Sequence, residues 1–233
     1  MGTLTVLRHG QASFGAANYD QLSAKGLSQA QALGRWWSQR GQRFDQVWMG
    51  GLARHRQTWD GVVQGAGPLG HTWPEAAVLP VFNEYDPEAL LACLPPEEAT
   101  VEAAVAAADA VTRQRHHFRR LKRALALWMA AEVAPIGMPA FSEFEGGLRD
   151  FMDRCRLQAL GQQVLVVSSG GPMSVMLKCS LGLDAAATIG LNMRVHNTAL
   201  SQWAFNPKRH ELLCFNSLPH LAQADAEGLI TSA

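Results

Sequence analysis

Arg8, His9 and Gly10 are the first residues in this sequence whose types and order could act on a phosphate group. They follow a short β-branched run, Thr3 to Arg8, which predicts a strand that ends in a loop. A neutral imidazole nitrogen is nucleophilic, and a neighbouring guanidinium offsets phosphate charge through paired hydrogen bonds. Gly10 would let the backbone approach an anion closely. Taken alone, the tripeptide fits a surface histidine beside an arginine better, so other segments must decide between the two interpretations.

A second candidate anion site follows the clearest buried strand of the sequence, Val164 to Ser168. Ser169-Gly170-Gly171-Pro172 comes next and predicts a turn into a helix, with Pro172 as a natural first residue. The free N–H groups at the start of that helix would favour an anion. Open α/β sheets place their ligand sites where a strand gives way to a loop, which is where both His9 and Ser169 stand.

The rest of the sequence predicts strands that alternate with helices. Helical apolar spacing runs from Ser28 to Arg40, and an alanine-rich stretch from Glu98 to Val133 predicts one long helix or a hairpin of two. Pro80 places the strand-like run from Ala77 to Phe82 at a sheet edge or shortens it. The other predicted elements are strands at Gln46 to Met49, Ala199 to Phe205 and Glu211 to Phe215, and helices from Arg54 and over Phe141 to Leu160.

This order predicts an α/β fold with three layers, in which helices cover both faces of a mostly parallel sheet with an antiparallel edge strand. The edge strand belongs to the hairpin around Asn206-Pro207-Lys208-Arg209. We expect one domain over residues 1–233, with a helical cap insert at about residues 87–162. The first strand should lie inside the sheet.

The composition excludes several classes of function. Twenty Lys and Arg residues balance twenty Asp and Glu residues, so no net charge favours nucleic acid or an anionic membrane, and an anion site has to be local. No apolar run spans a bilayer and no secretory signal begins the sequence, so we expect a cytoplasmic protein. The cysteines are widely separated in apolar surroundings, which favours free thiols over a disulfide or a metal site: Cys93, Cys155, Cys179 and Cys214.

Several segments, in order, resemble the histidine phosphatase superfamily, which includes the phosphoglycerate mutases. Leu22 to Ala30 resembles the LTxxGxxQA segment of the family, and Leu52 to Thr58 resembles its LxRxxQT segment. Glu84 stands at the distance of the family's acidic residue, and Val164 to Pro172 resembles its strand and glycine turn. Each segment is weak by itself, but the ordered set is specific and covers most of the chain.

The resemblance implies a role for each residue at these positions. His9 would be the nucleophile that becomes phosphohistidine, while Arg8 and Arg54 would clamp the phosphoryl oxygens. Glu84 would be the general acid that protonates the leaving oxygen, although a solvated loop carboxylate could have the same sequence. Such a reaction needs cationic donors around the phosphoryl oxygens, and the resemblance implies no metal and no other cofactor.

The sequence departs from the family at the turn after the buried strand. Family members usually carry a second histidine there, which donates a hydrogen bond to the transferring group, whereas this chain has Ser169, a shorter and neutral donor. Losing one such donor typically costs about 10²–10³-fold in rate, so a histidine at position 169 is expected to raise hydrolysis. Ser169 and Gly170 at the helix start, together with Gln11 or Ser13 near His9, would remain as phosphate donors.

Two further histidines have no role in the resemblance. His55 stands beside Arg54, where the family has a small residue, and the sequence offers no physical reason for it. His196 could enter the pocket, but a histidine near the start of a strand more commonly packs in the interior or lies on the surface.

We expect a metal-independent phosphomonoester hydrolase that acts on a small phosphorylated metabolite. The segment from Gln11 to Gln21 is shorter than in the family's mutases, which favours hydrolysis. The alternatives are a phosphate-binding or regulatory protein that has lost catalysis, favoured by Ser169, and, less well supported, a phosphoglycerate mutase. The expected partners are a phosphorylated substrate or inorganic phosphate, with neither nucleic acid nor membrane, and no feature predicts the oligomeric state. One cluster in the cap is most simply a solvated helix face, and less simply a site for a second anionic group: Arg113, Arg115, Arg119, Arg120, Lys122 and Arg123.

Overall fold

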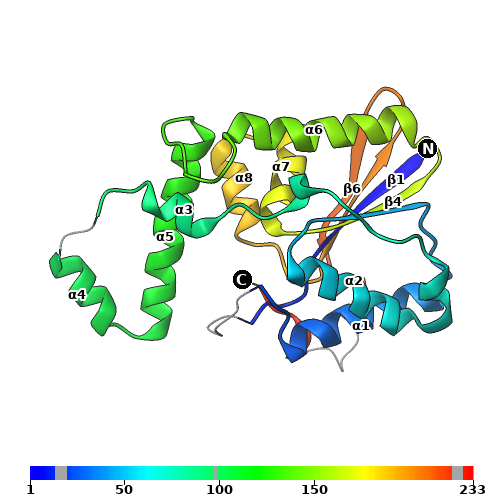
Figure 1. Cartoon of the computed structure of the whole chain (residues 1–233), viewed down its shortest axis with the longest axis horizontal. Helices are drawn as coiled ribbons and strands as arrows, with labels where there is room; N and C mark the ends of the chain where they lie inside the picture. The colour runs from blue at the N-terminus through cyan, green and yellow to red at the C-terminus, as the bar shows by residue number, and fades with distance from the viewer. Residues whose placement is uncertain (14–19, 97–98, 222–227, 233) are drawn as a thin grey trace.

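One six-stranded sheet organises the computed structural model, which describes residues 1–13, 20–96, 99–221 and 228–232 (Figure 1). Its strands are β1 (Gly2–Arg8), β2 (Gln46–Met49), β3 (Ala77–Val78), β4 (Gln163–Ser168), β5 (Leu200–Phe205) and β6 (His210–Ser217). They lie in the order β3-β2-β4-β1-β5-β6. The first four strands of this order are parallel, whereas β5 is antiparallel to β1 and β6 is antiparallel to β5. The predicted α/β fold and the interior position of β1 are confirmed.

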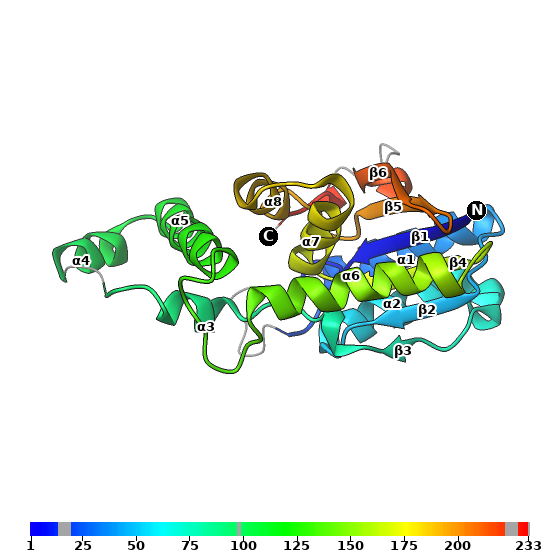
Figure 2. The ribbon, with the colours of Figure 1, turned by 90° about the horizontal axis from the view of Figure 1, so that it is seen from above.

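Helices cover both faces of the sheet, with α1 and α2 on one face and α6 and α7 on the other (Figures 1 and 2). The helices are α1 (Ala24–Gln39), α2 (Ala53–Ala66), α3 (Pro87–Ala92), α4 (Ala99–Ala107), α5 (Ala110–Met129), α6 (Phe141–Gln158), α7 (Gly170–Leu181) and α8 (Ala185–Asn192). Short 3-10 helices are η1 (Gly67–Thr72), η2 (Pro80–Phe82) and η3 (Pro219–Leu221). In the described part of the chain, no helix combines the length and the apolar character needed to cross a membrane.

The side chains of β4 explain why helices cover both faces. Successive residues of a strand point to opposite faces, and the four residues from Val164 to Val167 are all apolar. Val164 and Val166 join the core on the side of α6 and α7. Leu165 and Val167 join the core on the side of α1 and α2. A slip of one residue would exchange the two sets, so the packing on both faces fixes the register of β4 against β1.

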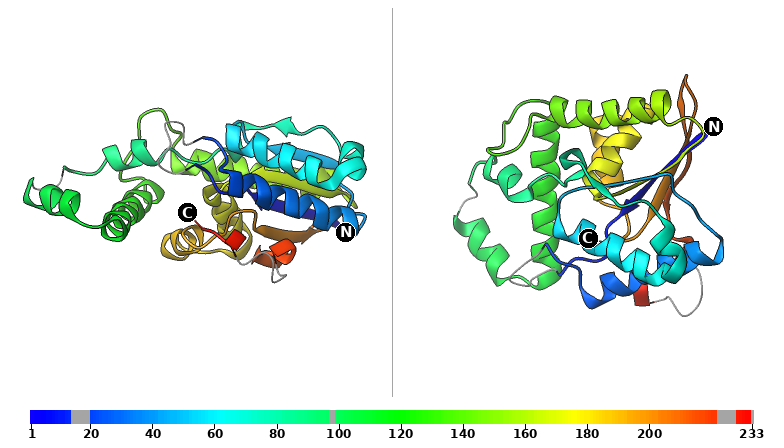
Figure 3. Two further views of the ribbon diagram at one scale, coloured as in Figure 1. Left: turned by 90° about the horizontal axis from the view of Figure 1, so that it is seen from below. Right: turned by 45° about the vertical axis from the view of Figure 1, so that its right-hand side comes forward.

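Helices α3, α4 and α5 extend beyond one end of the sheet (Figures 1 and 3). The alanine-rich stretch forms two helices, and Asp109 separates them because its carboxylate caps α5 by accepting the Thr112 N–H at 2.7 Å. The predicted start of this stretch, Glu98, lies outside the described residues. Helix α6 packs along the sheet, where Phe151 shares a core with Val164.

Several boundaries differ from the sequence prediction, and three of the differences have a local cause. Helix α1 begins four residues before Ser28, because the Ser23 hydroxyl accepts the Gly26 N–H at 3.1 Å and caps the helix there. Helix α7 begins at Gly170, ahead of Pro172. The strand at Ala77 lies at the sheet edge as expected but has only two residues, since η2 begins at Pro80. Helices α3 and α8 were not predicted.

Candidate active site

Two neighbouring parallel strands end side by side at the candidate site. In the register of β1 and β4, Arg8 lies opposite Ser168, and the His9 N–H donates to the Ser168 carbonyl at 2.9 Å. Strand β2 ends beside them, where the Gly50 N–H donates to the Val167 carbonyl at 3.1 Å. His9 and the residue after Ser168 therefore leave the sheet at the same edge, the usual position of ligand sites in open α/β sheets.

One hydrogen bond defines which nitrogen of the buried His9 ring carries the proton. Its Nδ1 lies 2.7 Å from the carbonyl oxygen of Gly10, and because a carbonyl only accepts, Nδ1 must donate. Burial, reinforced by the guanidinium groups of Arg8 and Arg54, lowers the pKa of His9 well below 6.5. The ring is therefore neutral near pH 7, and its lone pair is on Nε2. This nitrogen can attack an electrophile.

Both candidate phosphate-binding arginines are buried and held in place. Asp20 forms an ion pair with Arg54 through Oδ1 and Nη1 at 2.9 Å. The same carboxylate accepts the backbone N–H of Ala53 at 2.8 Å and that of Arg54 at 3.3 Å, so Asp20 also binds the free N–H groups at the start of α2. Arg8 donates from Nη1 to the carbonyl oxygen of Val195. Neither guanidinium needs a bound ligand to hold its position.

The carboxyl group of Glu84 meets the start of α7. The Gly171 N–H lies 3.1 Å from Oε1 and 3.2 Å from Oε2. Burial raises the pKa of Glu84 above 4.5, while Arg54, the Gly171 N–H and Arg8 act in the opposite direction. The same two arginines lower the pKa of His9, so these four side chains form one electrostatic cluster. Within the described ranges, no three His, Cys, Asp or Glu side chains form a group that could hold a metal ion.

Gly171 is needed because the Glu84 carboxylate sits against its Cα. A Cβ at this position would overlap Glu84 Oε1 and lie 2.7 Å from ring atoms of Tyr85. We expect Gly171→Ala to lower the free energy of unfolding by about 1–3 kcal/mol, the usual cost of overpacking, as measured by urea denaturation. In the control Gly146→Ala, no atom lies within 4 Å of the new Cβ in helix α6, so a gain of about 0.4–1 kcal/mol is expected. Equal stability of Gly171→Ala and wild type would contradict the close contact between Glu84 and Gly171.

Helix α2 is bonded directly to the loop that carries His9. The Gly10 N–H donates to Thr58 Oγ1 at 3.0 Å, and that hydroxyl donates to the Arg54 carbonyl at 2.6 Å. The threonine of the LxRxxQT segment therefore links the turn that bears Arg54 to the backbone next to His9. This role is structural, and it explains why the arginine and the threonine occur together.

Helix α1 begins against the same loop. A Cβ at Gly10 would lie 2.5 Å from the Gly26 carbonyl oxygen, so the close approach that Gly10 permits is to this helix. The Leu22 N–H, just before the helix, donates to Gln57 Oε1 at 2.8 Å. The two segments that resemble the family are thus bound to each other through Leu22 and Gln57.

His55, which the sequence left unexplained, also lies at the site. Its Nε2 is 2.7 Å from the hydroxyl oxygen of Ser169, and both residues are 0% exposed. The centre of its ring is 5.8 Å from that of His9. Burial and the Arg54 guanidinium lower the pKa of His55 to about 3, against the opposing effect of Asp20. His55 is therefore a second neutral imidazole beside His9.

Gln11 and Ser13, the two phosphate donors expected near His9, bond to residues around the start of α1. Gln11 Oε1 accepts the Ser23 hydroxyl at 2.9 Å, and its backbone N–H donates to Gln29 Oε1 at 2.8 Å. The Ser13 N–H donates to the Gln21 carbonyl at 2.8 Å. A direct role of either residue in phosphate binding stays a prediction. Most of the short segment from Gln11 to Gln21, residues 14–19, lies outside the described residues.

Gly170 and His196 occupy different surroundings. Gly170 is the first residue of α7, next to Ser169, and a Cβ there would lie 2.6 Å from Asn192 Oδ1. The His196 N–H donates to Asn216 Oδ1 at 2.7 Å. In the described part of the chain, the His196 ring makes no hydrogen bond to the cluster around His9. The alternative of a packed histidine therefore fits its position better.

Sequence reasoning missed three residues that hold the cluster: Asp20, Asn197 and Thr198. The carbonyl oxygen of His9 accepts the Thr198 N–H at 3.2 Å and Asn197 Nδ2 at 3.3 Å. Thr198 has a φ of 57°, an uncommon left-handed conformation for a β-branched residue. Isolated polar residues in loops have no periodic pattern. The one available signal was Asn197, since asparagine is common in turns.

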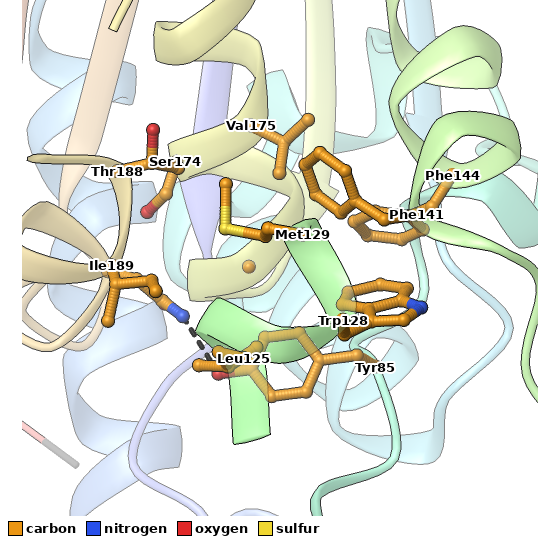
Figure 4. Close-up of a pocket in the computed structure, with 12 residues that line it drawn as sticks. Tyr85, Leu125, Trp128, Met129, Phe141, Phe144, Ser174, Val175, Thr188 and Ile189 are labelled. Carbon is orange, nitrogen blue, oxygen red and sulfur yellow. Dashed lines mark hydrogen bonds between the residues drawn. The ribbon is translucent and has the colours of Figure 1, made fainter. Parts of the chain in front are cut away.

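A small cavity of about 20 Å³ borders Gly171, with room for about one water molecule (Figure 4). Its wall is largely apolar and includes four aromatic rings, of which those of Tyr85 and Trp128 meet edge to face at 6.2 Å. Asn192 Nδ2 donates to the Tyr85 hydroxyl at 2.8 Å, the bond drawn as a dashed line in Figure 4. Helix α5, which carries Trp128, therefore reaches the residue next to Glu84.

A neutral histidine and two buried arginines lie at the carboxyl edge of a parallel sheet, so the chain is an α/β protein with a candidate anion site. The family model of the histidine phosphatase superfamily (branch 1) matches residues 100–218, just over half of the chain. The chain belongs to this superfamily. A comparison with curated proteins gave no match.

Solved structures show the same fold at low sequence identity. A phosphoserine phosphatase mutant from Entamoeba histolytica, in complex with phosphoserine, is 17% identical with a TM-score of 0.61, and the alignment covers 95% of this chain and 100% of that one. A mycobacterial glucosyl-3-phosphoglycerate phosphatase in complex with VO3 is 20% identical with a TM-score of 0.61, and the alignment covers 92% of this chain and 98% of that one. The alpha-ribazole phosphatase from Shigella flexneri is 21% identical with a TM-score of 0.59, and the alignment covers 93% of this chain and 96% of that one.

Proposed function

We propose that this chain is a metal-independent phosphomonoester hydrolase, which acts on a small phosphorylated metabolite through a phosphohistidine at His9. The hydrogen bond from His9 Nδ1 to the Gly10 carbonyl carries the proposal, because it leaves the Nε2 lone pair available for attack on phosphorus. The superfamily and the phosphatases among the structural relatives support the same class of reaction. The cytoplasmic location expected from the sequence stays a prediction.

The reaction would proceed in two steps that together consume one water molecule. First, the His9 Nε2 lone pair forms a bond to phosphorus, the bond from phosphorus to the leaving oxygen breaks, and that oxygen takes the Glu84 proton. In the second step, the oxygen of a water molecule bonds to phosphorus while the phosphorus–nitrogen bond breaks and its electron pair returns to Nε2. The water proton goes to the Glu84 carboxylate. The products are an alcohol and inorganic phosphate, and both residues return to their starting states.

Arg8 and Arg54 would stabilise the charge on the phosphoryl oxygens in both steps. Each guanidinium offers fixed N–H donors in a buried setting, where hydrogen bonds to an anion are stronger than in water. Their effect on the pKa of both His9 and Glu84 supports a common target for the two arginines. Donation by Ser169 and Gly170 at the start of α7, and by Gln11 or Ser13, belongs to the same proposal.

The insert between residues 87 and 162 would select the substrate. We assign this role to α3, α4 and α5, which extend beyond the sheet, because Trp128 of α5 packs on Tyr85 next to the proposed acid. Two of the solved relatives named above carry phosphoserine or VO3, which supports a small phosphorylated substrate or a phosphate-like oxyanion as ligand for this chain.

Ser169 favours a second candidate function, a phosphate-binding or regulatory protein without turnover. A panel of phosphomonoesters distinguishes the two, with inorganic phosphate release and the rise of melting temperature in phosphate measured on the same samples. We expect wild type to show both turnover and a phosphate-dependent rise. A rise without turnover above that of His9→Ala would identify the second function instead. With neither signal, the phosphate site itself would be rejected.

A further inference from the structure

The Ser169 hydroxyl makes its hydrogen bond outside its own helix. Ser169 is the N-cap residue of α7, where a serine oxygen commonly accepts an N–H from the first turn. It makes no such bond here. Its Oγ instead lies 2.7 Å from Nε2 of His55, which belongs to α2. The side chain is thus positioned by an imidazole from a different element.

The His55 ring fills the space beside the nucleophile. It lies 5.8 Å from the His9 ring, centre to centre, and it is completely buried. Gly50, directly after β2, makes room for it, because a Cβ at that position would overlap His55 Nδ1. The family has a small residue at the position of His55 and a histidine at the position of Ser169. This chain has the opposite arrangement, with the imidazole at position 55 and the short side chain at position 169.

The chemistry of the hydrogen bond determines how this pair would act on a phosphoryl group. A hydroxyl can accept one hydrogen bond while it donates another, and neutral imidazole has one N–H. A phosphoryl oxygen only accepts. Its presence therefore selects the arrangement in which His55 Nε2–H donates to Ser169 Oγ and the Ser169 O–H donates to the phosphoryl oxygen.

We propose that Ser169 and His55 together replace the second histidine of the superfamily. Ser169 donates the hydrogen bond to the transferring phosphoryl group, and His55 is a positioning residue that orients and polarises this hydroxyl from behind. The inference rests on the proposed phosphatase function. It adds a role for the histidine beside Arg54 that the resemblance left without one.

Single and double substitutions at positions 55 and 169 test the pair, because the losses of kcat should not add if the two residues act together. We expect Ser169→Ala and His55→Leu each to lower kcat by on the order of 10²-fold with little change in KM, as when one transition-state donor is lost. The double variant should be no slower than the slower single variant, because one donor is lost in all three. His55→Gln, whose amide nitrogen can reach the place of Nε2, should keep about tenfold more activity than His55→Leu. Equal activity of these two variants would contradict the hydrogen-bonding role of His55.

Exchange of the two residue types gives the most direct test. If the pair acts as proposed, Ser169→His alone would place a second imidazole against the buried His55 ring, so we now expect this single change to lower hydrolysis. The exchange His55→Ala with Ser169→His empties that space first, and it should recover activity to within about tenfold of wild type. If the melting temperature shows that the exchange variant folds poorly, the non-additivity of the single and double variants decides whether the two residues act as a pair.

The outcomes separate this inference from the proposed function. If wild type hydrolyses phosphomonoesters and His9→Ala does not, the phosphatase stands. In that case, additive losses at positions 55 and 169, or wild-type kcat in a well-folded His55→Leu, overturn the paired role alone. If wild type hydrolyses none of the panel, the proposed function fails first.

Discussion

Replacement of His9 with alanine is expected to lower kcat for phosphomonoester hydrolysis by at least about 10⁴-fold, comparable with the loss of the nucleophile in other covalent enzymes. The reason is the geometry of the ring, whose Nδ1 is bound to Gly10 and whose Nε2 lone pair is the group that would attack phosphorus. Wild type quenched with base during turnover of ³²P-labelled substrate should contain an acid-labile, base-stable phosphoenzyme. The same experiment with His9→Ala should give none.

Two controls show whether a loss at His9 reflects chemistry. His71→Ala removes an exposed histidine of η1 and should leave kcat unchanged. His9→Ala should still bind phosphate, because Arg8 and Arg54 are held by Val195 and Asp20. A phosphoenzyme that persists in His9→Ala would place the nucleophile elsewhere and reject the mechanism.

Replacement of Glu84 with glutamine is expected to lower kcat by about 10²–10⁴-fold for substrates with an alkyl leaving group, the usual contribution of a general acid. With p-nitrophenyl phosphate the loss should be much smaller, since that leaving group needs no proton. This dependence on the leaving group separates acid catalysis from a structural effect on the Gly171 turn. Glu88→Gln, which changes an exposed carboxylate on α3, should leave both rates unchanged.

The pH profile gives an independent test of Glu84. The active form has a neutral His9 and a protonated Glu84. Because the pKa of His9 is well below 6.5, protonation of His9 reduces the rate only at pH values well below that figure. Because burial raises the pKa of Glu84 above 4.5, the rate falls as the pH rises through that raised value. Glu84→Gln should lose this alkaline fall, while the ionisation of the substrate affects both proteins alike. An unchanged alkaline fall in the variant would exclude Glu84 as the acid.

The fold could be predicted because its strands and helices have strong local patterns. Buried strands were predicted from the apolar run Val164 to Val167 and from the β-branched run that ends at Arg8, and both strands are confirmed in the interior of the sheet. Helix α8 was missed because its eight residues are too short to establish a helical period. The start of α1 was missed because a single capping serine, Ser23, moves the boundary by a full turn.

The site could be predicted only where residues stand at strand ends or in motifs. His9, Arg8 and Arg54 were found in this way, and the structure brings them together with Glu84. The contact between His55 and Ser169 joins positions 114 residues apart, and no local pattern predicts a hydrogen bond over that distance. For the same reason, the sequence could identify a missing histidine but not its spatial substitute.

The formal charge of zero conceals an uneven distribution of charge. Helix α5 contains six lysine and arginine residues and no acidic residue, so the remainder of the chain has a matching excess of negative charge: Arg113, Arg115, Arg119, Arg120, Lys122 and Arg123. Much of that excess lies nearby, because residues 86–109 contain six acidic residues and no lysine or arginine. The helices beyond the sheet therefore combine a basic helix, α5, with an acidic segment before it, and α3 and α4 of that segment contact α5 (Figure 3). The Debye length is only about 8 Å at physiological ionic strength, so the two charge sets act mainly on groups close to them. The insert as a whole therefore attracts a distant polyanion little, although α5 alone is strongly basic.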